Sequence, residues 1–373
     1  MKKSILCLLL IVSAFNAFAQ DEKVNFSKKY RQQNNGKYQV EINEVKELIQ
    51  IMTAITKNGQ DNDDMIQQQG QYYKDVRAYF KPFENEPIIH TFDSLMNVSP
   101  FNFIFLTGNG FSYNFKGDKL VPSETFLFPA KSLNKITITE NPITTYKKEI
   151  EAFAKKSQFR KFYKQQKPYY TSIQRKYAQN ANLGKQWKWL EQNFQNRINQ
   201  YIIFCSPLTN SLNYTSTFKQ DDYKVIYMVL PPLDSFPTMS KMQLEIFNTR
   251  VMFTEIDHNY VTPPTQANKA TINELFKERA AWVDEKTEGT FAYPTPVKVF
   301  DEYMTYGVFV LYVQDHYDAA TFEEAKNGII SVMKDRGFIG MQVFTDNLLK
   351  ARAANPGKTI DEWYPAFLQL FAK

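Results

Sequence analysis

The chain has 373 residues, of which 43% are hydrophobic and 15% aromatic, and its formal net charge at pH 7 is +6. This apolar content excludes an intrinsically disordered chain and is sufficient for the core of one large or two ordinary domains. The small excess of positive charge is too weak to indicate a polyanionic partner by itself. Because the first residues indicate export, as described next, we expect no nucleic acid as a ligand.

The first residues, MKKSILCLLLIVSAFNAFAQ, have the pattern of a secretory signal peptide. A basic start at Lys2 and Lys3 precedes an apolar centre, and a small-x-small sequence ends at Ala19. The apolar centre is too short to span a membrane, and no later run reaches about 18 uninterrupted apolar residues. We therefore predict a signal peptide at residues 1–19, an exported mature chain that is periplasmic or extracellular, and no transmembrane segment in that mature chain.

The cysteine content predicts no disulfide bond within the mature chain. Cys7 lies within the predicted signal peptide, so Cys205 is the single cysteine of the mature chain and cannot close an internal disulfide. Because Cys205 ends an apolar run, we expect it to be a small buried hydrophobic residue.

Residues 20–230 are predicted to form an N-terminal α+β region. Apolar residues recur at helical spacing over 45–55 behind an Asn43 cap, and a second helix is expected over about 65–83. The pattern is helical again from 141 to about 195, with expected breaks at Pro168 and near Gly184.

Strands are predicted in the same region. Phenylalanines occupy every second position of 101–105 and the turn pair Asn109-Gly110 follows, which together predict a β-hairpin. Two apolar runs, 201–205 and 223–230, are expected to be buried strands.

Residues 231–373 are predicted to be mainly helical, either as a region of their own or continuous with the preceding one. Capping boxes, in which a Thr and a Glu three residues later satisfy amides of a helix N-terminus, occur at Thr271 with Glu274, Thr321 with Glu324, and Thr359 with Glu362. The fold class that follows is α+β, with small N-terminal and central β elements and a mainly helical C-terminal third.

Basic and aromatic residues are concentrated between Tyr146 and Leu190, where acidic residues are few. Such a mixture is able to hold an anionic glycan or a membrane surface. The simpler interpretation is a set of solvated helix faces, because runs of charge usually lie on the surface.

One stretch, RVMFTEIDHNYVTPP at 250–264, places ionisable side chains at catalytic spacing within an apolar run. On a helix, Thr254, Glu255 and His258 share one face, because positions three and four apart are neighbours. This is the register of the zinc-peptidase helix HExxH, with Thr254 in the place of the first His.

Glu302 is the second candidate position. It lies with Asp301 in VFDEYMTYGVFVLY at 299–312, a run so apolar that an isolated carboxylate costs several kcal/mol to bury unless it is paired or bound to metal. His258 is an available partner, because a Glu on a later helix completes the His₂Glu zinc site of thermolysin-like enzymes.

These motifs resemble the gluzincin branch of the zincin-like metallopeptidases. More narrowly, the chain is similar to a family of exported bacterial proteins defined as a domain of unknown function, in which a helix HEFxHxFxNP precedes a helix N-E-Y-M-T-W. TEIDHNYVTP and DEYMTYGVF match these two helices. WLEQNF, CSPL with Asn213-Tyr214, and YYKDVRAYFKPFENEP also resemble blocks of that family, over most of the mature chain.

The resemblance implies a zincin-like fold and roles for three residues. Glu255 matches the general base that polarises a metal-bound water, His258 the second His ligand, and Glu302 the carboxylate ligand of the metal. Tyr306, one turn after Glu302, is placed by its spacing to stabilise an oxyanion. The implied activity is hydrolysis of a peptide or protein substrate with zinc or another divalent transition metal.

Thr254 weakens this expectation. A neutral hydroxyl is a poor zinc ligand, and losing one of four ligands costs on the order of 3 kcal/mol, or roughly two decades of affinity. Three interpretations stay open. Glu255 itself ligates, in a site better suited to iron or manganese. A distant residue such as His90 or Asp257 supplies the missing ligand. According to the third interpretation, no metal binds, and the carboxylates form a buried polar network with His258.

The sequence therefore supports two hypotheses. The first is an exported zincin-like protein with a degenerate HExxH site, TEIDH, which is either a metal-dependent peptidase or an inactive relative of one. The alternative is a non-catalytic binding protein of the cell envelope that holds a peptide or an anionic glycan. His316 has no partner at metal-ligand spacing and is expected to be capped or solvent-facing.

Overall fold

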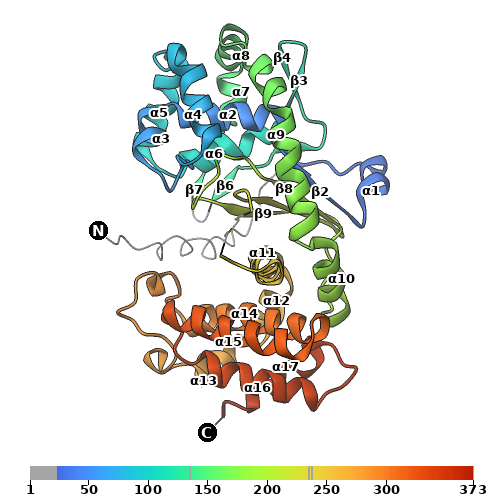
Figure 1. Ribbon diagram of the computed structural model, residues 1–373. Helices are drawn as coiled ribbons and strands as arrows, with labels where there is room; N and C mark the ends of the chain where they lie inside the picture. The colour runs from blue at the N-terminus through green and yellow to red at the C-terminus, as the bar shows by residue number, and fades with distance from the viewer. Residues whose placement is uncertain (1–22, 134–135, 234–235, 237, 373) are drawn as a thin grey trace, which may run out of the picture. The chain divides into compact units, whose positions relative to one another are not determined.

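The computed structural model describes residues 23–133, 136–233, 236 and 238–372, so the predicted signal peptide at residues 1–19 lies outside the described residues. The chain divides into two compact units (Figure 1). The N-terminal unit comprises Met1–Tyr177 and Ile198–Leu233, and the C-terminal unit comprises Ala178–Arg197 and Asp234–Lys373. The segment 178–197, which the sequence-based division assigns to the N-terminal region, therefore belongs to the C-terminal unit.

The N-terminal unit is built around a four-stranded sheet with the order β2-β8-β10-β9. Its strands are β2 (Lys37–Glu41), β8 (Gln200–Phe204), β10 (Tyr223–Val229) and β9 (Tyr214–Gln220). The first three are parallel, and β9 is antiparallel to β10. Every residue of β8 is buried, as in a parallel strand covered on both faces. Both strands predicted from apolar runs are confirmed, and Cys205 beyond β8 is buried as expected.

Shorter strands form two-stranded pairs in the same unit. They are β1 (Lys23–Val24) with β5 (Phe126–Phe128), β3 (Tyr113–Lys116) with β4 (Lys119–Pro122), and β6 (Ser132–Leu133) with β7 (Ile136–Thr137). The chain reverses between β3 and β4 at Gly117, whose φ of 58° is one that side-chain-bearing residues rarely adopt.

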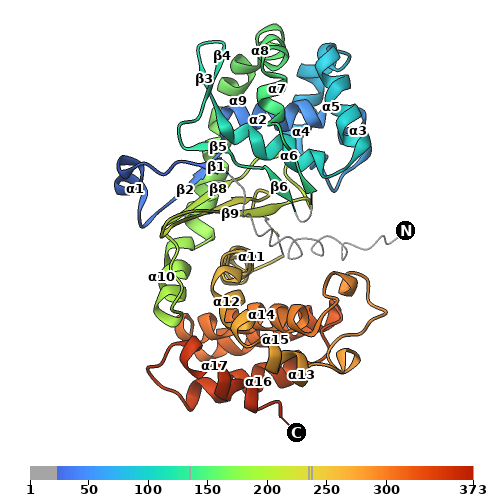
Figure 2. The ribbon, with the colours of Figure 1, turned by 180° about the vertical axis from the view of Figure 1, so that it is seen from behind.

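Most helices of the N-terminal unit lie on one face of the four-stranded sheet, as Figures 1 and 2 show. They are α2 (Glu44–Ala54), α3 (Lys57–Asp61), α4 (Gln71–Phe80), α5 (Pro87–Val98), α6 (Asn102–Asn109), α7 (Pro142–Thr145) and α8 (Lys147–Lys156), while α1 (Lys28–Asn34) stands apart from them. The Asn43 side chain caps α2 as predicted, accepting from the amides of Val45 and Lys46 at 3.1 Å. The helix predicted over 65–83 begins only at Gln71, because Gly70 has a φ of 92°.

The predicted hairpin at 101–110 is wrong, because this segment forms α6. Residues 103–109 are all buried, so the alternation of phenylalanines does not separate a core face from a solvent face. A short apolar run is ambiguous between strand and helix, and here the surrounding core decides. Gly108 and Gly110 permit close packing, since a Cβ atom on Gly108 would lie 2.6 Å from Cβ of Ala130 and one on Gly110 would lie 2.9 Å from Cα of Lys46.

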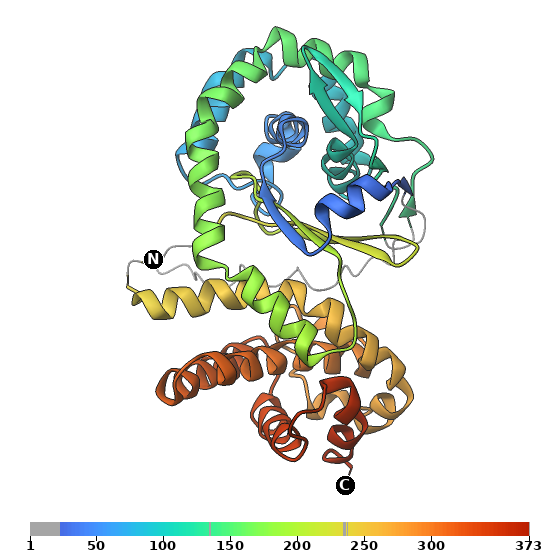
Figure 3. The same ribbon diagram turned by 90° about the vertical axis from the view of Figure 1, so that its right-hand side faces the viewer.

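Helix α9 (Phe159–Asn180) runs along one side of the N-terminal unit, drawn in green in Figure 3. The Tyr163 hydroxyl donates to the carbonyl oxygen of Ile42, and the Gln174 amide donates to that of Val40 at 3.0 Å. Pro168 lies inside α9 and does not end it; the break comes at Asn182, whose φ is 52°.

The described elements of the C-terminal unit are helical apart from short 3₁₀ turns. They are α10 (Leu183–Asn193), α11 (Lys241–Ile256), α12 (His258–Ala267), α13 (Lys269–Leu275), α14 (Pro296–His316), α15 (Ala319–Asp335), α16 (Met341–Ala353) and α17 (Ile360–Gln369). Every residue from 299 to 313 on α14 is buried, and this helix packs against α11, α12, α13, α15 and α16. The predicted α+β class with a mainly helical C-terminal part is confirmed.

Only one of the predicted capping boxes is confirmed, at Thr359 and Glu362 in front of α17. Thr321 lies inside α15, whose cap is Asp318; its side chain accepts from the amides of Ala320 and Thr321 at 3.0 Å. Thr271 lies inside α13, which begins at 269. An earlier cap therefore displaces the predicted start of α15.

Candidate functional site

The TEIDH stretch crosses the junction of α11 and α12. Asp257 joins the two helices, and its amide donates to the carbonyl oxygen of Phe253 at 2.9 Å. The Asp257 carbonyl oxygen accepts from the amides of Tyr260 at 2.7 Å and Val261 at 2.8 Å. The helical course expected for 250–264 is therefore present, divided into two helices at Asp257.

Thr254 occupies the position of the first zinc ligand but is bonded within its own helix. Its hydroxyl lies 3.1 Å from the carbonyl oxygen of Arg250 and 3.3 Å from that of Val251. Back-bonding of this kind is the usual way in which a Thr inside a helix satisfies its hydroxyl. The Thr254 side chain is thus satisfied without a metal.

His258 faces helix α14. Its Nδ1 atom lies 3.3 Å from the Thr305 hydroxyl and 3.8 Å from a carboxylate oxygen of Asp301, and its ring is 12% exposed. The same Asp301 oxygen accepts a hydrogen bond from the Thr262 hydroxyl at 3.0 Å. Asp301 and Thr305 lie one turn apart on α14, so that turn fixes the imidazole. The sequence showed Asp301 only as an acidic exception in an apolar helix.

Glu302 pairs with a residue that sequence reasoning missed. Its carboxylate accepts from Arg336 Nη2 at 2.7 Å, with exposed side-chain fractions of 3% for Glu302 and 10% for Arg336. Arg336 also donates to the Tyr293 hydroxyl at 3.1 Å, and its guanidinium lies 5.0 Å from the ring centroid of Tyr306. Glu302 therefore has the partner that its burial demands, but this partner is Arg336 and not the predicted His258.

Acidic side chains dominate the surroundings of His258. Burial alone would lower the pKa of His258, but the Asp301 carboxylate and further acidic charges raise it to about 9. Burial raises the pKa of Glu255 to about 7 and that of Asp257 well above its ordinary value. Both carboxylate oxygens of Asp257 are buried without a hydrogen-bond partner among the described residues. At neutral pH the imidazole is therefore protonated and acts as a cation among carboxyl groups.

These residues do not fit a zinc ion in the arrangement observed. A zinc site needs about three protein ligands whose lone pairs converge on one point. Within the part of the chain that the structure describes, no group of three His, Cys, Asp or Glu side chains is arranged to hold a metal ion. Thr254 is bonded within its own helix and Glu302 is paired with Arg336.

The other histidines lie away from this cluster. His90 is exposed on α5 of the N-terminal unit. His316 ends α14, where its Nδ1 atom lies 2.8 Å from the carbonyl oxygen of Tyr312 and its ring packs on that tyrosine. His316 is thus bonded at a helix end, as predicted.

A minority of the basic residues of 146–190 are paired with acids of the N-terminal unit. Arg160 binds Glu44 at 2.8 Å, and Lys156 binds Glu86 at 2.6 Å. Neighbouring aromatic side chains enter the core, where Tyr170 bonds Tyr72 at 2.6 Å. The other Lys and Arg side chains of this stretch are exposed.

The chain matches no protein-family model, no curated protein and no solved structure. Among the described helices, none combines the length and the apolar character that a membrane span requires.

Proposed function

We propose that this chain is an exported zincin-like protein of the gluzincin type that has become non-catalytic. Arg336 supplies the positive charge at Glu302 that a catalytic metal supplies in a peptidase. The observation that carries the proposal is the buried ion pair of 2.7 Å between the two side chains.

Three features of the site support this proposal together. Thr254 stands where the first His ligand belongs, and its hydroxyl is bonded to its own helix. Glu302, the implied carboxylate ligand, is held by a guanidinium that is always charged. The order of elements, with the TEIDH helices before a later helix carrying Glu302, is the order that the zincin-like hypothesis requires.

Metal analysis tests this proposal. The mature chain, purified without a metal-affinity tag and dialysed against zinc, should contain far less than one equivalent of zinc by elemental analysis. The double variant Thr254→His/Arg336→Met supplies an imidazole and removes the competing cation. We expect it to retain close to one equivalent, because it restores a His₂Glu donor set.

The matched control is Thr254→His/Arg336→Lys, which adds the same imidazole but keeps a cation beside Glu302. It should retain little zinc, and circular dichroism should show that both double variants are folded. The proposal is wrong if the unmodified chain holds one equivalent of a transition metal that His258→Ala and Glu302→Ala remove.

A further inference from the structure

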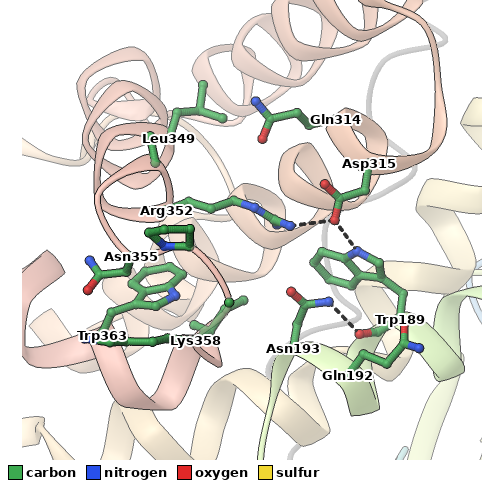
Figure 4. A pocket seen from close by; sticks show the side chains of 14 residues that line it. Trp189, Gln192, Asn193, Gln314, Asp315, Leu349, Arg352, Asn355, Lys358 and Trp363 are labelled. Atoms are coloured by element: carbon green, nitrogen blue, oxygen red, sulfur yellow. Dashed lines mark hydrogen bonds and ion pairs between the residues drawn. The ribbon is translucent and has the colours of Figure 1, made fainter.

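A pocket of about 540 Å³ opens in the C-terminal unit, apart from the TEIDH cluster and sharing no residue with it (Figure 4). Its walls come from α10, the end of α14, the end of α16, and the loop and first turn that lead into α17. This volume lies within the range of pockets that hold small ligands. About half of the lining residues are polar or charged, so the pocket suits a polar ligand.

Asp315 organises one wall of this pocket. A single oxygen of its carboxylate accepts from Trp189 Nε1 at 2.7 Å and from Arg352 Nη2 at 2.6 Å, as Figure 4 shows. The second terminal nitrogen of Arg352, Nη1, is buried and has no hydrogen-bond partner among the described residues. The Arg352 side chain as a whole is 25% exposed and lines the pocket, so its guanidinium offers positive charge to an anionic ligand there.

Two asparagines present acceptors to the same space. The Asn193 amide nitrogen donates to the carbonyl oxygen of Trp189 at 2.8 Å, and the Asn355 amide nitrogen donates to that of Ala351 at 2.9 Å. Each bond fixes its amide group and leaves the side-chain oxygen available as an acceptor. Hydroxyl groups of a ligand can donate to both oxygens.

Trp363 and Lys358 complete the wall opposite Asp315. Trp363 is only 2% exposed, and its indole N–H forms no hydrogen bond within the described residues. Lys358 is exposed at the rim. With Arg352 it gives the lining one more positive than negative charge, since Asp315 is its one acid.

From this lining we infer that the pocket binds an acidic saccharide, with the sugar carboxylate near Arg352 and Lys358 and the hydroxyls on the fixed amides and the Trp363 N–H. The amide groups of the two asparagines can hydrogen-bond the hydroxyl groups of a sugar, and the indole rings of the lining can pack against its C–H faces. The lining is entirely from helices and their connections, so no strand edge is present to pair with an extended peptide. This inference rests on the pocket alone and does not need the proposed function to hold.

Calorimetric titration of the mature chain tests the inference. The probes are trisaccharides of galacturonic, guluronic or mannuronic acid, the neutral trisaccharide of galactose, and the acidic tripeptide Glu-Glu-Glu. We expect at least one acidic trisaccharide to bind, and the neutral trisaccharide and the tripeptide to bind at least about tenfold more weakly. Absence of binding by every acidic trisaccharide at about 1 mM, or equal binding of the tripeptide, overturns the inference.

Two variants locate the binding site. Lys358→Gln removes the exposed cation at the rim, and Trp363→Phe removes the N–H while it keeps an aromatic ring. Each variant should weaken binding about five- to tenfold. The matched control is Lys334→Gln, an exposed lysine at the end of α15 that does not line the pocket. If Lys334→Gln weakens binding as much as Lys358→Gln does, the anion is held by general surface charge and the pocket assignment is wrong.

Discussion

Replacing Arg336 with Met is expected to lower the free energy of unfolding of the C-terminal unit by about 3–5 kcal/mol, because it leaves the buried Glu302 carboxylate without its cation. The pair spans 2.7 Å, and the Glu302 side chain is only 3% exposed. Urea unfolding followed by tryptophan fluorescence measures this change. The signal is specific for the C-terminal unit, since all 4 tryptophans of the chain, at positions 187, 189, 282 and 363, lie within it.

Two comparisons separate loss of the ion pair from loss of packing. The double variant Glu302→Gln/Arg336→Met removes both charges, and its stability should lie within about 1–2 kcal/mol of the unmodified chain. Arg352→Met breaks the more exposed pair with Asp315, whose side chains are 25% and 33% exposed, and should cost about 1 kcal/mol or less. Equal losses for Arg336→Met and Arg352→Met would contradict the assigned role of the buried pair.

The sequence predicts those features of the site that depend on neighbouring residues and misses those that depend on packing between distant segments. The cost of burying Glu302 is local, so the need for a partner could be predicted from the apolar run around it. The identity of that partner, Arg336, could not be predicted in the same way. Arg336 follows α15 at a turn where Gly337 has a φ of 88°, and no spacing rule connects that turn with α14. Asp301 was visible in the same run, but only the crossing of α12 and α14 sets it beside His258.

The elements of the fold also differ in whether neighbouring residues or long-range packing determine them. Strands β8 and β10 are apolar on both faces, and their sequence alone identifies them. Helix α6 has the alternating phenylalanines of a strand, yet it is a helix that packs against α2 and α5 with residues 103–109 buried. The cap of α2 depends on neighbouring residues and was predictable, whereas the passage of 178–197 into the C-terminal unit depends on long-range packing.

A second cluster of buried charges in the N-terminal unit carries no sequence signature. Lys46 on α2 donates from Nζ to the Thr107 carbonyl oxygen and to the Tyr214 hydroxyl, each at 2.8 Å. Glu47, the next residue, accepts from the Tyr72 hydroxyl at 2.7 Å through one oxygen, and its other oxygen is buried without a hydrogen-bond partner among the described residues. Both Lys46 and Glu47 are 0% exposed.

Burial shifts the ionisation of these groups in opposite directions. It raises the pKa of Glu47 from 4.5 to about 7 and lowers that of Lys46 from 10.5 to about 7. Between pH 5 and 7 the folded chain keeps a proton on Glu47 that the unfolded chain releases, so stability falls as the pH rises. Above pH 7 the unfolded chain keeps the proton on Lys46 that the folded chain releases, so stability rises again. This cluster therefore contributes least near neutral pH.

Glu47→Gln is expected to remove most of the fall between pH 5 and 7 and to raise the free energy of unfolding of the N-terminal unit at pH 7 by up to about 3 kcal/mol. The amide of Gln can still accept from Tyr72 but carries no charge to desolvate. The measurement is urea unfolding at pH 5, 6, 7 and 8 by far-ultraviolet circular dichroism. The transition without a change in tryptophan fluorescence belongs to the N-terminal unit, which contains no tryptophan.

The matched control is Glu149→Gln, an exposed carboxylate on α8 in the same unit, which should leave the pH profile unchanged. Glu41, whose pKa burial also raises to about 7, stays in place in both variants, so a smaller fall should persist after Glu47→Gln. A profile of the unmodified chain that is flat or rises from pH 5 to 7 would mean that Glu47 is already ionised there. In that case the charge of Lys46, rather than a proton kept on Glu47, neutralises the Glu47 carboxylate in the folded chain.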